Sequence, residues 1–283
     1  MKRIGNLYEK VCSIENLQLA DEKARKGKLR TYGVIEHDKN REANLLKLRE
    51  TLLNGTFHTS KYDVFTIYEP KEREIYRLPY FPDRILHHAI MNVLEPIWVS
   101  TFTADTYSCI KNRGIHAAAK KVKQALREDP EGTTFCLKLD IRKFYPSINH
   151  DVLKSILRRK LKDKRLLRLL DEIVDSADGV PIGNYLSQYF ANLYLTYFDH
   201  WIKEQKRVKH YFRYADDIVI LASDKAYLHS LMGEIRAYLG DLKLEVKGNW
   251  QVFPVAARGI DFVGYVFFHT HTRMRKGIKK TFC

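Results

Sequence analysis

The chain of 283 residues carries 49 Lys and Arg against 34 Asp and Glu, which gives a formal net charge of +15. Its hydrophobic content of 45% supports a real core, and its length allows one large domain or two modest ones. A positive excess of this size favours a polyanionic partner, and nucleic acid is the usual one. The sequence has no long uncharged apolar run, which argues against a membrane-spanning helix.

The N-terminus and the cysteines give an expectation for the cellular compartment of the protein. Residues 1–6 lead into charged residues and lack the apolar region of a signal peptide. Cys12, Cys109, Cys136 and Cys283 are scattered without metal-type spacing, so we expect free thiols in a reducing environment. We therefore expect a cytoplasmic protein with no membrane partner.

The predicted elements of the N-terminal half are mainly helical. Residues 7–55 place apolar positions among many charges, which predicts helices. Residues 62–82 alternate apolar and polar positions and end at prolines, which predicts extended chain, and residues 84–98 return to helix. Residues 134–140 then predict a strand whose last residue is Asp140.

The C-terminal half mixes helices with short strands. Residues 149–176 predict one or two basic amphipathic helices, and residues 184–207 predict one long helix. The remaining predicted elements are a hairpin at 211–222, a helix at 225–240, a strand near 242–247 and a last strand pair near 251–268. Helices packing on one face of a small antiparallel sheet predict the α+β class.

An adjacent pair of acids, Asp216 and Asp217, lies between two runs of strand-forming residues in the segment 211–221. A β-hairpin would carry such a pair at its tip. Because neighbouring carboxylates repel each other, keeping both ionised normally requires a cation. The pair therefore suggests a divalent metal site, and an ordinary polar turn is the alternative.

A third acid, Asp140, would project from the end of the strand at 134–140. Together with Asp216 and Asp217 it would supply the three carboxylates of a two-metal site for phosphoryl transfer. Mg²⁺ suits such a site because it takes few carboxylates and keeps positions for substrate phosphates. The alternative for Asp140 is a helix N-cap before Ile141.

The segment 179–188 places a Pro and Gly turn in front of a helix. Exposed backbone N–H groups at such a helix start can face a template or a phosphate. The alternative is a plain helix entry with Asn184 as its cap.

These three elements, in this order, resemble the palm of a reverse transcriptase. Other segments resemble the family's two finger motifs and the segment that grips the primer end. These segments are Arg73–Pro79 with Asp83, Arg84 and His87–Ile90, then Tyr107–His116, and finally Gly259–Tyr265. The resemblance extends over most of the chain, from about residue 70 to residue 268.

The resemblance implies a right-hand polymerase fold with fingers and palm, in which helices back an antiparallel palm sheet. We expect a helical N-terminal extension at 1–60, fingers at 61–133 and a palm at 134–268, with finger helices partly interleaved at 149–178. Residues 269–283 are expected to form a basic tail or the start of a thumb. The thumb is accordingly expected to be absent or minimal.

Two positions point to a subgroup of prokaryotic enzymes with a palm like that of group II introns. Most reverse transcriptases carry Gln where this chain has Ile182, and Pro where it has Gln188. The pattern here is similar to that of diversity-generating retroelement enzymes, which copy a template RNA with frequent errors at adenines. Because Ile182 cannot form a hydrogen bond near the nascent pair, geometric discrimination is expected to loosen. Some bacterial antiviral-defence reverse transcriptases share parts of the pattern and remain an alternative.

The resemblance also implies roles for the site residues. Asp140 and Asp216 would ligate two Mg²⁺ ions, with Mn²⁺ as a substitute, Asp217 would support them, and Ile141 is assigned to the same metal site. Tyr145 falls where the family places the aromatic gate beside the sugar 2′ position, with a buried core tyrosine as the alternative. The other expected nucleotide-binding residues are Arg73, Lys111, Arg113, Ile182 and Gly183, and the expected primer-grip residues are Gly259, Phe262, Gly264 and Tyr265.

One departure from the family concerns the acid that protonates pyrophosphate. Relatives often place a Lys near position 250, where this chain has Trp250. Lys247 is one substitute and water is the other. Trp250 itself is equally compatible with a place in the core.

The expected function is RNA-directed DNA polymerisation of an error-prone, retroelement-associated kind, in a bacterial or phage-encoded protein. The expected partners are an RNA template, a DNA or RNA primer, deoxynucleoside triphosphates, and a small basic accessory protein or a noncoding RNA. The alternatives are an antiviral-defence enzyme that copies a noncoding RNA and an RNA-binding scaffold without catalysis. An RNA-dependent RNA polymerase is a further alternative, and Tyr145 argues against it.

Overall fold

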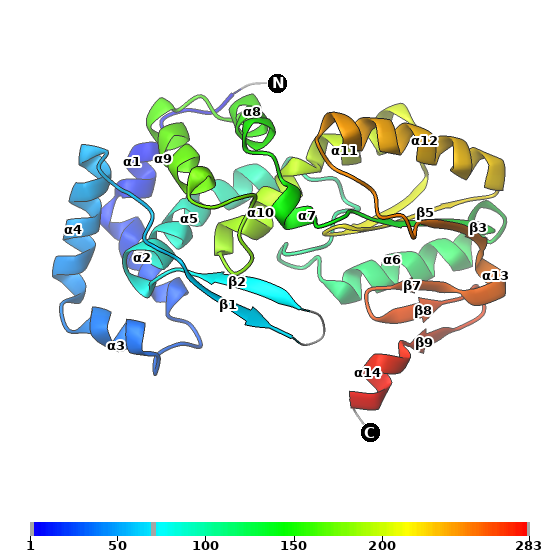
Figure 1. Ribbon diagram of the computed structural model, residues 1–283, viewed down its shortest axis with the longest axis horizontal. Helices are drawn as coiled ribbons and strands as arrows, with labels where there is room; N and C mark the ends of the chain where they lie inside the picture. Colours follow the sequence, from blue (N-terminus) through cyan, green and yellow to red (C-terminus); the bar gives the residue numbers. More distant parts are fainter. Residues whose placement is uncertain (1–2, 69–71, 282–283) are drawn as a thin grey trace. The chain divides into compact units, whose positions relative to one another are not determined.

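The computed structural model describes residues 3–68 and 72–281. The chain divides into two compact units, each built from two stretches of sequence (Figure 1). The first unit combines Met1–Thr101 with Ile148–Tyr194, and the second combines Phe102–Ser147 with Leu195–Cys283. Each unit therefore joins two segments that are far apart in the sequence.

The first unit is mainly helical and carries one two-stranded antiparallel sheet. Its elements before the first crossing are α1 (Tyr8–Cys12), α2 (Ile14–Ala24), α3 (Tyr32–Asp38), α4 (Arg41–Asn54), β1 (Asp63–Ile67), β2 (Arg73–Arg77), η1 (Tyr80–Arg84) and α5 (Ile85–Val99). Those after it are α8 (His150–Lys160), α9 (Lys164–Asp175) and α10 (Tyr185–Tyr194). The predicted helices at 7–55, 84–98 and 149–176 are thus confirmed, the last as two helices.

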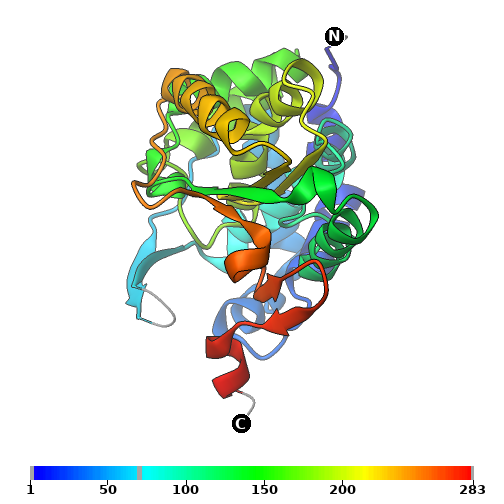
Figure 2. The ribbon, with the colours of Figure 1, turned by 90° about the vertical axis from the view of Figure 1, so that its right-hand side faces the viewer.

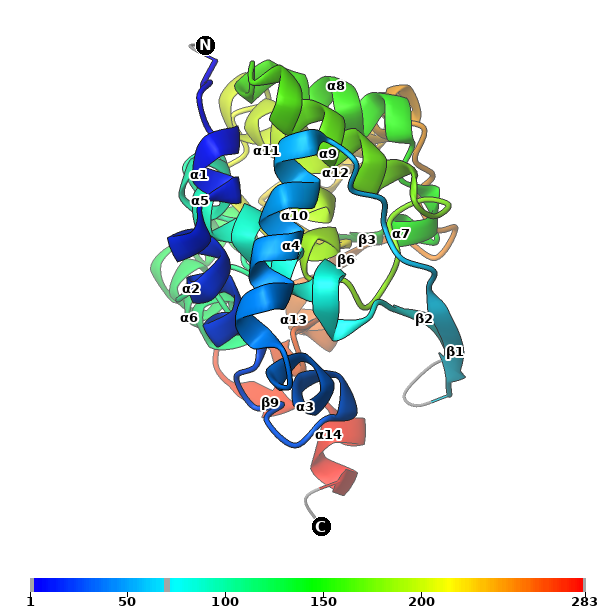
Figure 3. The ribbon, with the colours of Figure 1, turned by 90° about the vertical axis from the view of Figure 1, so that its left-hand side faces the viewer.

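Helix α5 forms the centre of the first unit. Its buried side chains include Ile85, Ile90, Leu94 and Trp98, which point to more than one side of the helix. A helix that buries side chains on more than one side needs other elements packed around it. Helices α1, α2 and α10 pack against α5 and supply that cover (Figure 3).

A buried carboxylate ties three parts of this unit together. Asp21 in α2 has no exposed surface, and it accepts hydrogen bonds from the Tyr80 hydroxyl at 2.5 Å, from Arg25 at 2.7 Å and from Arg41 at 2.6 Å. Burial acts to raise the pKa of Asp21, but these hydrogen bonds outweigh it and leave the pKa below its ordinary value. The charge is therefore fully compensated, as a buried carboxylate requires.

The second unit contains two antiparallel sheets. Its elements up to the second crossing are α6 (Ile115–Glu128), η2 (Glu131–Thr133), β3 (Phe135–Asp140) and α7 (Phe144–Ser147). The later ones are α11 (Thr196–His200), η3 (Trp201–Gln205), β4 (His210–Tyr214), β5 (Asp217–Ala222), α12 (Lys225–Asp241), β6 (Gln251–Pro254), α13 (Val255–Arg258), β7 (Ile260–Phe262), β8 (Tyr265–Phe267), β9 (Thr272–Met274) and α14 (Lys276–Thr281).

The larger sheet has the strand order β4-β5-β3-β6, and each neighbouring pair is antiparallel. Helix α12 covers one face, while α6 and the β7-β8-β9 sheet lie against the other (Figures 1 and 2). Along β3, the side chain of Cys136 is buried under α6, whereas Leu137 faces away from it. This alternation assigns every residue of the central strands to one face or the other.

The predicted long helix at 184–207 is wrong as a single helix. The segment forms α10, α11 and the π-helical turn η3, and the chain leaves helical geometry at Leu195, with φ −96° and ψ 0°. This break coincides with the crossing from the first unit to the second. Residues 184–207 contain neither Gly nor Pro, so the sequence has no strong helix breaker that would signal the break.

The predicted strand near 242–247 is also wrong. Lys243 adopts a left-handed backbone conformation, with φ 59°, and Leu244 donates a hydrogen bond to the Leu239 carbonyl, which ends helix α12. Only Val246 pairs, in an isolated antiparallel bridge with Ile141. The alternating apolar residues are explained by the helix end, where Leu244 is buried against α12.

The last predicted strand pair, near 251–268, is divided between two sheets. Strand β6 joins β3 in the larger sheet, and α13 separates it from the β7–β8 hairpin. That hairpin belongs to the second sheet, which β9 completes. The strands were thus predicted, but their pairing partners depend on contacts that the local pattern does not contain.

The structure bears on two expectations, those of free cysteine thiols and of no membrane-spanning helix. Cys12, Cys109 and Cys136 are free thiols, and Cys283 lies outside the described residues. Within residues 3–68 and 72–281, every helix is too short or too polar to cross a bilayer.

Candidate active site

Two of the three candidate catalytic acids are direct neighbours across the larger sheet. The register of β3 and β5 pairs Asp140 with Asp217. Residues directly opposite each other in an antiparallel pair point to the same face, with Cβ atoms about 5 Å apart. Both acids end the stripe that begins with Cys136 and Leu221, so this face changes from an apolar core to a charged edge.

The third acid, Asp216, lies in the two-residue turn between β4 and β5. Tyr214 pairs with Asp217, so Ala215 and Asp216 form the turn. Ala215 has φ 55°, while Asp216 is not among the residues with positive φ. This pattern corresponds to a type II′ turn, which usually carries Gly at its first central position. The predicted hairpin at 211–222 is confirmed, with the acid pair at its tip.

The three carboxylates interact electrostatically. Burial and the nearby Asp140 carboxylate raise the pKa of Asp216 to about 6. Burial raises the pKa of Asp217 to about 6 as well; Lys138 opposes this rise and Asp140 adds to it. The site therefore concentrates negative charge that a cation would stabilise.

Two lysines already lie against these acids. The Lys247 ammonium is 2.6 Å from Asp140 Oδ1, and the Lys138 ammonium is 3.5 Å from Asp217 Oδ1. Lys138 also donates a hydrogen bond to the carbonyl of Asp261 in β7. Sequence reasoning missed Lys138, although strand alternation places a residue two positions before Asp140 on the same face.

The donor set fits a divalent cation. Asp217 Oδ1 is buried and accepts no hydrogen bond, and carboxylate oxygens are the hard ligands that Mg²⁺ prefers. Within the described residues, no three acidic, His or Cys side chains converge closely enough to form a ready-made cage. Asp140 and Asp217 each lie beside a different ammonium group, that of Lys247 and that of Lys138.

The alternative reading of Asp140 as a helix N-cap does not describe this structure. Asp140 is the last residue of β3, and helix α7 begins only at Phe144. Ile141 is fully buried, in its bridge with Val246. Its backbone thus continues directly from the strand that carries Asp140.

The same unit holds three of the expected nucleotide-binding residues. Tyr145 lies in α7, is half-buried, and meets the Phe144 ring edge-on at 5.6 Å between centroids. Lys111 is exposed, whereas Arg113 donates a hydrogen bond to the Thr103 carbonyl at 2.8 Å. Part of the Arg113 guanidinium is therefore committed to its own loop.

The other three, Arg73, Ile182 and Gly183, belong to the first unit. The Tyr76 amide in β2 donates to the Ile182 carbonyl at 2.8 Å, which docks the 179–184 loop onto the strand that begins with Arg73. Gly183 has φ 122°, and a Cβ there would lie 2.7 Å from the Tyr76 carbonyl oxygen. Only glycine fits this position.

A groove of about 190 Å³ runs beside Gly183. Its walls combine basic side chains with aromatic ones, including Lys28, Arg77, Tyr76 and Tyr185. Cationic and aromatic groups together suit a nucleotide or a single-stranded nucleic acid.

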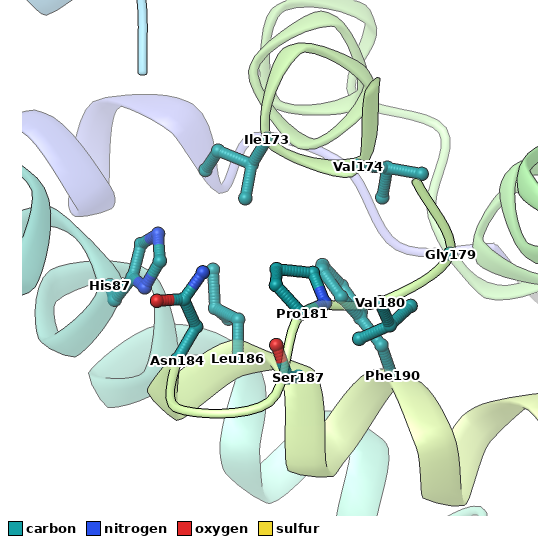
Figure 4. A pocket seen from close by; sticks show the side chains of 10 residues that line it. All are labelled: His87, Ile173, Val174, Gly179, Val180, Pro181, Asn184, Leu186, Ser187 and Phe190. Carbon is teal, nitrogen blue, oxygen red and sulfur yellow. The ribbon is translucent and has the colours of Figure 1, made fainter. Parts of the chain in front are cut away.

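The underside of the 179–184 loop is closely packed. The cavity there has a volume of about 10 Å³, which is at most enough for one water molecule. The side chains that line it include His87, Ile173 and Pro181 (Figure 4). Burial lowers the pKa of His87 to about 3, so the ring is neutral at physiological pH. This cavity supports the loop and is too small for a ligand.

The expected primer-grip segment forms the β7–β8 hairpin. Val263 and Gly264 have φ of 44° and 88°, which is the type I′ turn that suits the twist of a two-residue hairpin. Phe262 is fully buried in the core beneath α6, whereas Tyr265 is half-buried with Lys123 6.0 Å above its ring. Gly259 also has a positive φ, of 74°, at the start of the hairpin.

Lys247, the proposed substitute for the family's lysine, and Trp250, which occupies the lysine position, lie in different surroundings. The side chain of Lys247 lies at the carboxylate cluster, on Asp140. Trp250 is half-buried on the surface of α12, where Arg236 lies 5.1 Å above its ring and His229 meets it edge-on. Trp250 is thus a half-buried surface residue packed on α12, not a core residue.

Comparison with known proteins settles the family. A family model described as "Reverse transcriptase (RNA-dependent DNA polymerase)" matches residues 69–267, the greater part of the chain. The chain belongs to the reverse transcriptase family. Its members are RNA-directed DNA polymerases, and the expectation of such an enzyme is confirmed at this level.

The relatives include bacterial and organellar proteins. Protein YkfC of Escherichia coli is 26% identical over 274 residues, which cover 80% of this chain and 71% of YkfC. The group II intron-encoded protein LtrA of Lactococcus lactis is 23% identical over 191 residues, covering 62% of this chain but only 31% of LtrA. The expected relation to prokaryotic, group II intron-like enzymes is confirmed.

Solved structures agree on the fold. Apo telomerase from Candida tropicalis superposes with a TM-score of 0.55 at 12% identity, over 77% of this chain and 49% of that one. The chain therefore spans about half the length of this structural neighbour. At so low an identity the likeness shows the fold alone, and the expected α+β polymerase fold with fingers and palm is confirmed.

Proposed function

We propose that this reverse transcriptase copies an RNA template into cDNA from a DNA or RNA primer, using deoxynucleoside triphosphates. The observation that carries the proposal is the register that pairs Asp140 with Asp217 and leaves Asp216 on the adjoining turn. In this proposal residues 1–60 are an extension, 61–133 the fingers and 134–268 the palm, with 149–178 partly interleaved and 269–283 a tail or thumb start.

The proposed cofactor is a pair of Mg²⁺ ions, for which Mn²⁺ can substitute. Asp140 and Asp216 would hold them, with Asp217 in support and Ile141 beside them. Bound there, divalent cations would lower the pKa of the primer 3′-hydroxyl and neutralise charge on the reacting phosphate. Lys138 and Lys247 would keep the acids ionised and in place before the ions bind.

The chain's own residues would bind and orient the substrates. Arg73, Lys111 and Arg113 are the residues proposed to neutralise triphosphate charge. Ile182 and Gly183 would bring backbone close to the nucleotide, which the absence of a Cβ on Gly183 permits. Lys247 is the proposed acid for the departing pyrophosphate, because its ammonium already lies at the acids.

The β7–β8 hairpin is the proposed grip for the primer end. Gly259 and Gly264 supply its left-handed backbone positions, and Phe262 anchors it from beneath. Gly264 and Tyr265 are half-buried, so both have surface left for a primer, and Tyr265 offers an aromatic side chain. The template–primer would bind largely through phosphates, so added salt would weaken it.

Primer extension on an RNA template with Mg²⁺, followed by sequencing of the product, tests this function. We expect full-length cDNA, with misincorporation concentrated opposite adenines. Absence of any extension would refute the polymerase proposal and favour an RNA-binding scaffold. Faithful copying at adenines would refute only the error-prone retroelement subgroup, which rests on Ile182 and Gln188.

The context proposed for this enzyme is a retroelement of a bacterium or phage, in the cytoplasm, with a small basic accessory protein or a noncoding RNA as partner. The net charge of +15 supports an RNA partner in particular. An antiviral-defence enzyme that copies a noncoding RNA would have the same chemistry. RNA recovered with the protein separates the two contexts, because a defence enzyme would retain its own template.

Replacing Tyr145 by Ala tests the proposed sugar gate. We expect discrimination against ribonucleotides to fall by about 10- to 100-fold, because removing the ring opens space for the 2′-hydroxyl. The measurement is the ratio of kcat/KM for a deoxynucleotide and the matching ribonucleotide. Tyr227→Ala is the control, since Tyr227 is 40% exposed on α12; an unchanged ratio for Tyr145→Ala would remove the assignment.

A further inference from the structure

Strand β4 carries a charged residue at a position with no exposed surface. Arg213 and its partner Asp199 in α11 are both fully buried. Arg213 Nε donates to Asp199 Oδ1 at 2.7 Å, and Nη2 donates to Oδ2 at 2.6 Å. This is the two-point geometry in which arginine binds a carboxylate most strongly.

The Asp199 carboxylate has further donors. The Tyr211 hydroxyl donates to Oδ1 at 2.6 Å and the Thr106 hydroxyl donates to Oδ2 at 2.9 Å. A buried ion pair is tolerated only when such additional hydrogen bonds satisfy it, and an apolar pair of similar volume is often just as stable. Stability alone therefore does not explain why this strand carries an arginine.

The third nitrogen of the guanidinium connects the pair to the candidate active site. Arg213 Nη1 donates to the Ala215 carbonyl at 3.0 Å. Ala215 is the first residue of the turn that carries Asp216, and its φ of 55° is unfavourable for a side chain with a Cβ. The guanidinium thus holds a strained turn at one fixed point.

The backbone of Arg213 holds a second segment. Its amide donates to the Asp105 carbonyl at 3.0 Å, and its carbonyl accepts from the Tyr107 amide at 3.0 Å. The chain then continues to Lys111 and Arg113, the residues proposed for triphosphate charge. One residue is therefore bonded to both the acid-bearing turn and the start of that segment.

Strand alternation keeps Arg213 away from the reacting groups. Arg213 pairs with Ile218, so its side chain lies on the face opposite to that of Asp217 and Asp140. We propose that Arg213, fixed by Asp199, is a positioning residue that sets the Asp216 turn for catalysis. This inference rests on the proposed polymerase function.

The double variant Arg213→Met with Asp199→Leu separates positioning from stability. It replaces the ion pair by apolar side chains and removes the hydrogen bond to Ala215. Because the buried Tyr211 and Thr106 hydroxyls lose their acceptor, we expect its Tm to fall while the protein stays folded at the assay temperature. We expect its kcat to fall by about 10²-fold and its KM for deoxynucleotides to change less than about threefold. A kcat near that of the unaltered protein would overturn the proposal.

Arg213→Lys decides the matter if the double variant fails to fold. Its ammonium can still pair with Asp199, but it lacks the fork that also reaches the turn. We expect a folded protein with lowered kcat that needs several-fold more Mg²⁺ for half-maximal rate. Unaltered kcat and Mg²⁺ requirement in Arg213→Lys would again overturn the proposal.

A measurement without activity separates this proposal from the proposed function. Added Mg²⁺ is expected to raise the Tm of the unaltered protein more than that of either Arg213 variant. Equal shifts would count against the positioning role, whereas failure of the unaltered protein to extend a primer would count against the polymerase. Lys206→Gln with Glu234→Gln, which removes an ion pair between the residue that follows η3 and α12, is the matched control.

Discussion

Asp216→Asn is expected to remove nucleotide incorporation and, at the same time, to stabilise the protein in the absence of divalent metal. The activity should fall by about 10³-fold or more, because the amide removes a carboxylate charge from the site where charge develops in the transition state. The stability should rise because burial and the Asp140 carboxylate disfavour the Asp216 charge. Residues that serve function often lower the stability of the folded protein.

The sign of the pH dependence follows from the raised pKa values. The folded protein binds protons at Asp216 and Asp217 up to about pH 6, whereas the unfolded chain releases them near pH 4. Unfolding free energy of the metal-free protein therefore decreases as pH rises from about 4 to 6, and the full penalty is present at pH 7. Asp216→Asn should recover about 1–3 kcal/mol of it.

Chemical denaturation at pH 5 and pH 7, with and without Mg²⁺, measures this effect. Asp241→Asn serves as the control, since Asp241 is an exposed acid at the end of α12. Mg²⁺ should stabilise the unaltered protein and the control, but not Asp216→Asn. A variant that loses stability at pH 7, or keeps its incorporation rate, would contradict the assignment of Asp216 to the metal site.

The acids could be assigned from sequence because each lies beside a strong strand signal. Asp140 ends an alternating strand, and Asp216 and Asp217 separate two strand-forming runs, so their place at strand ends was predictable. Their convergence was not a property of either segment. It depends on the register that pairs β3 with β5, and the family resemblance supplied that pairing where local patterns could not.

The partners of these acids were harder to foresee. Lys138 could have been found from alternation alone, but its contact with the Asp261 carbonyl depends on how β7 packs against the sheet. Arg213 stands between aromatic residues in a strand, which is an unusual setting for a charge. Its partner Asp199 lies in the segment predicted as one long helix, and the break at Leu195 separates α11 from that helix.

Gly183→Ala is the second substitution for which we expect a large effect. The new Cβ would lie 2.7 Å from the Tyr76 carbonyl oxygen and 3.2 Å from Ile75 Cγ2, on a backbone with φ of 122°. The carbonyl belongs to a paired strand and cannot retreat as a flexible side chain would, so the 179–184 loop must move instead. A loop displaced by about 1 Å costs a reaction about 10²-fold.

Single-nucleotide incorporation and thermal melting, measured together, distinguish displacement of this loop from general unfolding. We expect kcat/KM to fall by about 10²-fold while most of the cooperative melting transition remains, because the altered contact is confined to the loop and β2. Gly233→Ala is the matched control: no atom lies within 4 Å of its Cβ position in α12, so it should leave the rate unchanged and favour the helix by up to about 1 kcal/mol. If Gly183→Ala incorporated nucleotides at the original rate, the loop would have no part in holding them, and the role proposed for Ile182 in fidelity would lose its structural basis.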